Sequence, residues 1–61
     1  MSILSYAIVL HSVVPVRSEA DEGAEQLTQL LFGETVEILK EQPRWYYIHN
    51  DYDGQEGWVD F

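Results

Sequence analysis

Apolar residues in this chain come in short runs with a period of two, and turn-forming residues separate the runs. Such alternation places successive side chains on opposite faces of an extended strand, whereas a helix repeats every 3.6 residues. The runs are rich in valine, isoleucine and aromatic residues, which favour sheet. The pattern predicts extended segments at residues 6–10, 13–16, 26–32, 35–41, 45–49 and 57–59.

The segment at residues 26–32 is ambiguous. Leu27, Leu30 and Leu31 have helical spacing there, so a short amphipathic turn is an alternative to a strand. A helix of this length would be marginally stable in isolation, and Gly33 would end it at once. We therefore predict a strand.

Strands this short, with no long helix, predict an all-β domain built as a small barrel or an orthogonal sandwich. The chain has 61 residues and no cysteine, so no disulfide or thiolate metal site can reinforce it. A domain of this size buries only about 60% of the surface of its unfolded chain, so its core must be densely apolar. The predicted core residues are Val14, Val16, Val36, Ile38, Ile48 and Val59.

The net charge of −8 limits the partners of this chain. Eleven acidic residues face three basic ones, Arg17, Lys40 and Arg44. A surface of this sign repels a phosphate backbone or an anionic membrane, so we expect neither nucleic acid nor membrane as a partner. Amines, peptides and basic protein surfaces fit it better. His11 and His49 show no ligand-type spacing, so we predict no metal and no cofactor.

Residues 18–25 contain no large apolar side chain and are predicted to form a loop that carries four carboxylates. Such a run is usually a solvated surface. The alternative is that one carboxylate, Glu19, points into a groove and binds an ammonium group, because a desolvated amine needs an acidic partner. Arg17 precedes the loop and either anchors it or contacts a ligand.

Aromatic residues form a second candidate group. Tyr46 is assigned to the core, so strand alternation places Trp45 and Tyr47 on the outer face. With Tyr52 and Trp58 they would form an exposed apolar patch, and such patches commonly bind partners. Packing at the rim of the barrel is the alternative for all of them except Tyr52, which lies in a polar loop.

Four motifs, in this order, resemble the bacterial SH3 domain (SH3b). They are Val14-Pro15-Val16-Arg17, Gly33 with Val36-Glu37-Ile38, Trp45-Tyr46-Tyr47-Ile48 and Gly57-Trp58-Val59. The family has Val-x-Val-Arg, a glycine with Val-x-Val, Trp-x-x-Val and a terminal Gly-Trp-Val. The resemblance covers nearly the whole chain. It implies one domain over residues 1–61, folded as an SH3-like barrel of five to six short strands.

Residues 12–19 and 28–34 resemble, more narrowly, the N-terminal module of NlpC/P60-type cysteine peptidases. Those enzymes cleave γ-D-glutamyl–diamino acid bonds in peptidoglycan stem peptides, and their catalytic Cys and His lie in a separate C-terminal domain. The resemblance therefore implies a non-catalytic module at the N-terminal end of a longer protein, with the catalytic domain as its partner. The N-terminus has neither the basic region nor the long apolar run of a signal peptide, so we expect muropeptide recycling in the cytoplasm, with the cell envelope as the alternative location.

The family's N-terminal module recognises a free amino terminus with an acid and a tyrosine, which implies these roles for Glu19 and Tyr52. We therefore predict that the 18–25 loop and the 50–57 loop lie together at one end of the barrel. They would flank a groove close to Trp45, Tyr47 and Trp58. The alternatives to stem-peptide recognition are docking of Pro-rich or basic segments and a purely structural role.

Overall fold

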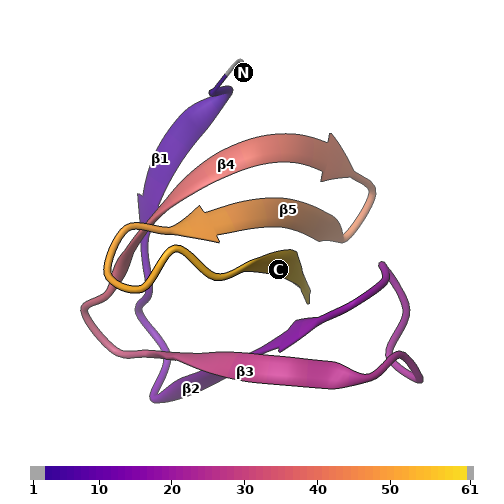
Figure 1. The fold of residues 1–61 in the computed structure, drawn as a ribbon. Helices are drawn as coiled ribbons and strands as arrows, with labels where there is room; N and C mark the ends of the chain where they lie inside the picture. The colour runs from indigo at the N-terminus through magenta and orange to yellow at the C-terminus, as the bar shows by residue number, and fades with distance from the viewer. Residues whose placement is uncertain (1–2, 61) are drawn as a thin grey trace.

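The computed structural model describes residues 3–60, which form six strands and no helix (Figure 1). A membrane-spanning helix is accordingly not found among these residues. The prediction of an all-β domain with five to six short strands is confirmed, and the ambiguous segment is a strand. The strands are β1 (Ser5–Ile8), β2 (Val13–Arg17), β3 (Gln26–Leu31), β4 (Thr35–Gln42), β5 (Trp45–Asn50) and β6 (Glu56–Asp60).

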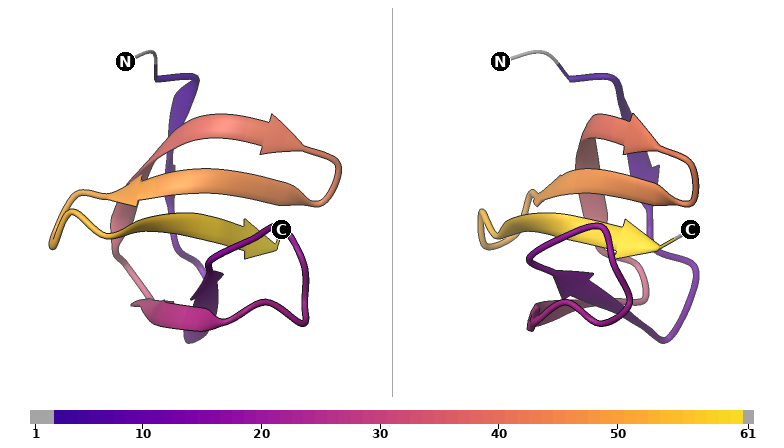
Figure 2. Two further views of the ribbon diagram at one scale, coloured as in Figure 1. Left: turned by 45° about the vertical axis from the view of Figure 1, so that its right-hand side comes forward. Right: turned by 90° about the vertical axis from the view of Figure 1, so that its right-hand side faces the viewer.

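The strands form one antiparallel sheet in the order β1-β4-β5-β6-β2-β3. The sheet curls so that β4, β5 and β6 lie across the β2–β3 hairpin (Figures 1 and 2). Register shifts in β2 and β4 bend these strands, as bulges do. One residue pair, Arg17 with Trp58, links β2 to β6. The two parts of the sheet therefore cross at an angle and enclose an SH3-like core.

The core contains the predicted residues. Val16 and Ile48 are fully buried, and Val14 is partly buried against the core cluster. Two further core residues, Val9 and Leu30, were not predicted. Val9 lies after β1, where its backbone N–H donates to Glu34 and its carbonyl accepts from Gly33, so its side chain is fixed against the sheet. The complete cluster is Val9, Val16, Leu30, Val36, Ile38, Ile48 and Val59.

Strand alternation in β5 separates the aromatic residues as predicted, but it does not expose all of the outer ones. Tyr46 packs against the core. Trp45 stands outside the core cluster, yet only 8% of it is exposed, so its assignment to an exposed patch is wrong. Pro15, Arg17 and Glu22 line a small cavity together with its side chain. Strand β2 and the loop that follows it therefore cover the tryptophan.

Candidate functional site

The two loops that were predicted to flank one groove lie at opposite ends of β4, so that prediction is wrong (Figure 1). Glu22 of the first loop lies 3.4 Å from Arg44, which follows the end of β4. Asp51 of the second loop accepts a hydrogen bond of 3.1 Å from the Thr35 hydroxyl, at the start of β4. Strand β4, which is eight residues long, runs from one contact to the other. Sequence order did not indicate this, because β2 crosses β6 at an angle and directs its loop toward the β4–β5 turn.

Glu19 and Tyr52, the predicted amine-binding pair, are therefore not neighbours. Both are exposed, and Tyr52 is exposed by 86%. The backbone N–H of Tyr52 donates to the side chain of Asn50, which fixes the turn but leaves the ring in solvent. A ligand-binding role for either residue stays a prediction, but the two residues do not line one groove.

Tyr47 and Trp58 meet on the outer face of β5 and β6. Their rings pack edge to face, with centroids 5.1 Å apart. The Tyr47 hydroxyl donates to Glu56 over 3.2 Å, and the Lys40 ammonium lies 5.3 Å from the ring centroid. Burial, together with the Glu56 carboxylate, raises the pKa of Tyr47. Tyr47 thus has packing partners on several sides, which fits the rim-packing alternative.

Arg17 anchors the acidic loop. Its guanidinium donates to the Ala24 carbonyl at 3.0 Å, and the Ser18 N–H donates to the Glu25 carbonyl at 2.9 Å. The interpretation of Arg17 as a structural residue is therefore confirmed.

An apolar cleft of about 680 Å³, a volume typical of ligand sites, lies in the surface of the domain. Core residues form its floor, and the segment between β1 and β2 forms a wall. Ile8, at the end of β1, and Leu10, in that wall, are exposed by 54% and 70%, so both offer apolar surface to a ligand. Sequence analysis missed this cleft because it combines residues from distant strands.

Polar side chains stand at one rim of the cleft. Arg44 and Asp60 are among its lining residues, and the Arg44 guanidinium lies 2.8 Å from the Asp60 carboxylate. The hydrogen bond and charge of Asp60 raise the pKa of Arg44. Arg44 has a φ of 72°, which is uncommon for a residue other than glycine. The Pro43-Arg44 turn therefore places the guanidinium between the carboxylates of Asp60 and Glu22. One positive charge lies there between two negative charges.

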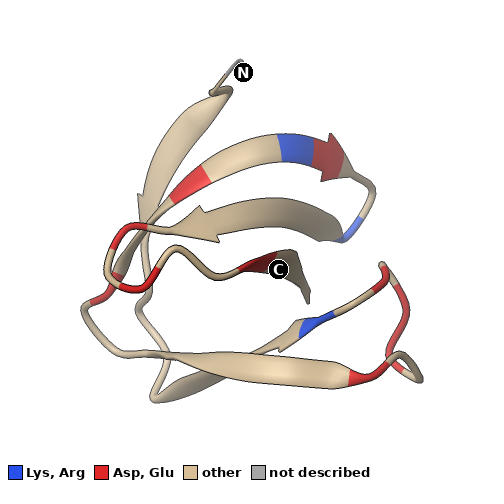
Figure 3. Ribbon diagram, viewed as in Figure 1, with Lys and Arg blue, Asp and Glu red and all other residues tan. Residues whose placement is uncertain are grey.

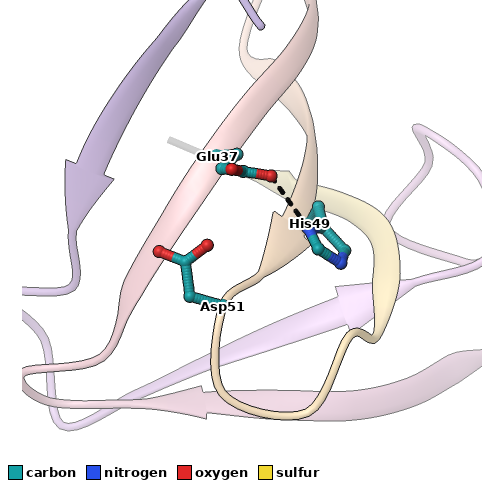
Figure 4. Close-up of side chains that lie close together, drawn as sticks. All are labelled: Glu37, His49 and Asp51. Atoms are coloured by element: carbon teal, nitrogen blue, oxygen red, sulfur yellow. Dashed lines mark hydrogen bonds and ion pairs between the residues drawn. The ribbon is translucent and has the colours of Figure 1, made fainter. Parts of the chain in front are cut away.

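A second cluster lies on the outer face of β4 and β5 (Figure 4). His49 Nδ1 lies 2.8 Å from Glu37 Oε1, and the two residues are direct cross-strand partners. Asp51 follows His49 by two positions and projects toward the same place (Figure 4). The hydrogen bond to Glu37 raises the pKa of His49, and the charges of Glu37, Glu56 and Asp51 add to that effect. Sequence spacing gave no sign of this cluster, because strand pairing brings Glu37 to His49.

Comparison with known proteins agrees with this geometry. The family described as "Bacterial SH3 domain" matches residues 12–60. The chain belongs to this family. No curated protein and no solved structure matches the chain. Membership of the family indicates a binding or recognition module. The cleft, with its charged rim, and the cluster of Glu37, His49 and Asp51 are the two candidate binding sites of this SH3 domain.

Charge is distributed unevenly over this SH3 domain (Figure 3). Its three basic residues lie toward the end that carries the β4–β5 turn: Arg17 at the end of β2, Lys40 in the second half of β4, and Arg44 in the turn. The opposite end, where the loop between β5 and β6 lies, carries acids without lysine or arginine. The rim of the cleft therefore has mixed charge, whereas the surface around His49 is strongly anionic.

Proposed function

We propose that this SH3 domain is a non-catalytic recognition module for peptidoglycan stem peptides with a free amino terminus, and that it serves an NlpC/P60-type peptidase. The observation that carries the proposal is the apolar cleft with Arg44 and Asp60 at its rim. A stem peptide combines an amine, carboxylates and short aliphatic groups, and each of these has a counterpart in or beside the cleft.

The chemistry of the rim suits a ligand that carries both charges. The carboxylate of Asp60, with that of Glu22 nearby, can accept hydrogen bonds from an ammonium group. Arg44 can then pair with a ligand carboxylate through its guanidinium fork. Aliphatic parts of the peptide would contact the exposed side chains of Ile8 and Leu10 in the cleft, where burial of apolar surface contributes about 25 cal/mol per Å². A peptide that is only cationic would use the acids but not Arg44.

Catalysis would belong to a separate domain. A cysteine peptidase attacks with a thiolate, and this chain has no cysteine. We expect no hydrolysis when the 61-residue chain is incubated with a stem peptide, and release of the diamino acid, followed by chromatography, would contradict this. Muropeptide recycling in the cytoplasm is the setting that we propose.

The alternative function is docking of Pro-rich or basic segments. The Tyr47–Trp58 ring pair, with Glu56 beside it, is the observation that favours it, because polyproline segments bind aromatic surfaces. This surface lies outside the residues that line the cleft. The two functions therefore predict different contact residues.

A titration followed by NMR separates these functions. We expect an Ala-γ-D-Glu-diamino acid peptide to shift amide signals along the cleft, at Leu10, Val13 and Arg44. The variant Asp60→Asn should bind this peptide at least about tenfold more weakly, because a charge-assisted hydrogen bond contributes about 1.5–3 kcal/mol. Binding of the N-acetylated peptide should not change. The control Asp53→Asn removes the same charge at the other end of the domain and should leave both affinities unchanged.

Two outcomes contradict the proposal. Equal losses of the free and acetylated peptides in Asp60→Asn would exclude recognition of the amine. Shifts that appear only at Tyr47 and Trp58, and only with a Pro-rich basic peptide, would support docking in its place.

A further inference from the structure

The surface cluster of Glu37, His49 and Asp51 has the composition of a metal-ion site. We propose that these three residues bind a divalent transition-metal ion, with Zn²⁺ as the reference ion. One potential ligand atom from each residue lies within 4.8 Å of the others. The proposal is independent of stem-peptide binding, because the cleft rim and this cluster lie at opposite ends of β4.

Strand geometry holds two of the ligands in place. Glu37 and His49 are cross-strand partners on β4 and β5, and both side chains are only partly exposed, by 22% and 33%. Neighbouring side chains restrict them, so little conformational entropy is lost when they bind an ion. Asp51 is exposed and lies in the turn after β5, where the Thr35 hydroxyl donates to it. Its carboxylate can move toward an ion by a rotamer change.

The distances suit zinc after a small adjustment. Zinc binds histidine nitrogen and carboxylate oxygen at about 2.0–2.2 Å, so neighbouring ligands of a tetrahedral ion lie about 3.3 Å apart. The Nδ1 of His49 and the Oε1 of Glu37 are joined by a hydrogen bond of 2.8 Å, so one proton lies between them. An ion that replaces the proton between them would separate these atoms slightly. The bound imidazole would be neutral with its proton on Nε2, so a proton would be released to solvent only from the doubly protonated ring. A carboxylate oxygen of Asp51 and a water molecule would complete four ligands.

The donor set selects among cations. Calcium and magnesium prefer sites made of oxygen ligands, whereas imidazole nitrogen favours zinc, copper and nickel. No cysteine is present to form a thiolate site. One imidazole with two carboxylates therefore favours a borderline transition metal over the hard cations.

The electrostatic surroundings favour a cation. Glu56 is the cross-strand partner of His49 on its other side, so acids flank the imidazole on both neighbouring strands. The basic side chains contact other groups: Arg17 the Ala24 carbonyl, Arg44 the Asp60 carboxylate, and Lys40 the Tyr47 ring. Within residues 3–60, no lysine or arginine therefore neutralises the negative field at the cluster, and a divalent ion would be attracted to it.

Isothermal titration calorimetry of the untagged 61-residue chain with ZnCl₂ tests the proposal. We expect one ion per chain. His49→Gln, Glu37→Gln and Asp51→Asn should each weaken binding by at least tenfold, because even the loss of a group that only supports a metal ligand typically costs about 10–100-fold. The control Glu41→Gln removes the same charge from the same strand, and His11→Gln removes the other histidine. Both controls should bind within twofold of the unchanged chain.

NMR on the unchanged chain provides a second measurement that needs no variant. Zn²⁺ should shift the imidazole nitrogen signals of His49 and the amide signals of Asp51, whereas those of His11 should stay constant. Equal weakening by Glu41→Gln and Glu37→Gln would overturn the proposal. NMR shifts of equal size with MgCl₂ at the same concentration would also overturn it. Both outcomes would indicate diffuse attraction of cations to an acidic surface.

Discussion

At Gly57, strand β6 approaches β2 so closely that no side chain fits between them. A Cβ atom at this position would lie 2.5 Å from a Val16 methyl carbon and 2.9 Å from the Arg17 carbonyl oxygen. Val16 is fully buried and cannot move aside, and the second contact is with backbone. The glycine of the Gly-Trp-Val motif is therefore required by packing between strands and not by a turn.

Substitution Gly57→Ala is expected to lower the free energy of unfolding by about 1–3 kcal/mol, because overpacking shifts surrounding atoms. Urea denaturation followed by tryptophan fluorescence measures this. The control Gly23→Ala, where the nearest atom would be 3.6 Å away, should change the free energy by less than about 0.5 kcal/mol. Equal midpoints for the two variants would show that the β6–β2 contact is not tight in solution.

Strand β4 contributes both to the core and to the outer surface of the sheet. It pairs with both β1 and β5, and its inward residues Val36 and Ile38 are buried in the core. Its outward Glu37 belongs to the surface cluster. The strand therefore links the core to the proposed metal site.

Truncation of Ile38 to alanine is expected to cost about 2–5 kcal/mol, since it removes buried carbon atoms and leaves a cavity. That is a large share of the stability of so small a domain. Thermal unfolding followed by circular dichroism measures the loss, with Glu41→Ala on the exposed end of β4 as the control. A melting temperature of Ile38→Ala equal to that of the control would contradict the assignment of Ile38 to the core.

At the scale of the whole molecule, like charges lie close together. The domain measures 25 × 25 × 18 Å and carries a net charge of −8. At about 0.01 M salt the Debye length is about 30 Å, so each charge interacts with nearly all others. Repulsion between acids therefore opposes folding at low salt.

We expect the melting temperature to rise when sodium chloride increases from about 0.01 M to about 1 M, because the Debye length then falls to about 3 Å. A gain of about 1 kcal/mol corresponds to a rise of about 4–8 °C for a domain of this size. Potassium chloride should have the same effect, and the double variant Glu41→Gln with Asp53→Asn should respond less. A melting temperature that falls with salt would contradict net repulsion.

Local pattern determined the strands, the turns and most of the core. The alternation around Val36 and Ile38 specified an inward face, because strand side chains alternate whatever the strand pairs with. The break between the predicted segments 35–41 and 45–49 contains Pro43, which cannot extend a central strand, so local sequence is enough to end β4 there. The same local rule placed Tyr46 inward and Tyr47 outward.

Contacts between distant residues were decided by tertiary structure. Trp45 is buried because β2 and its loop cover it, and alternation within β5 carries no information on that cover. Glu19 and Tyr52 are apart, and Glu37 and His49 are together, because strand crossing and register set those distances. The sequence by itself thus determined which residues face inward in each strand. Only the folded chain decided which loops share an end, since that depends on the angle at which the strands cross.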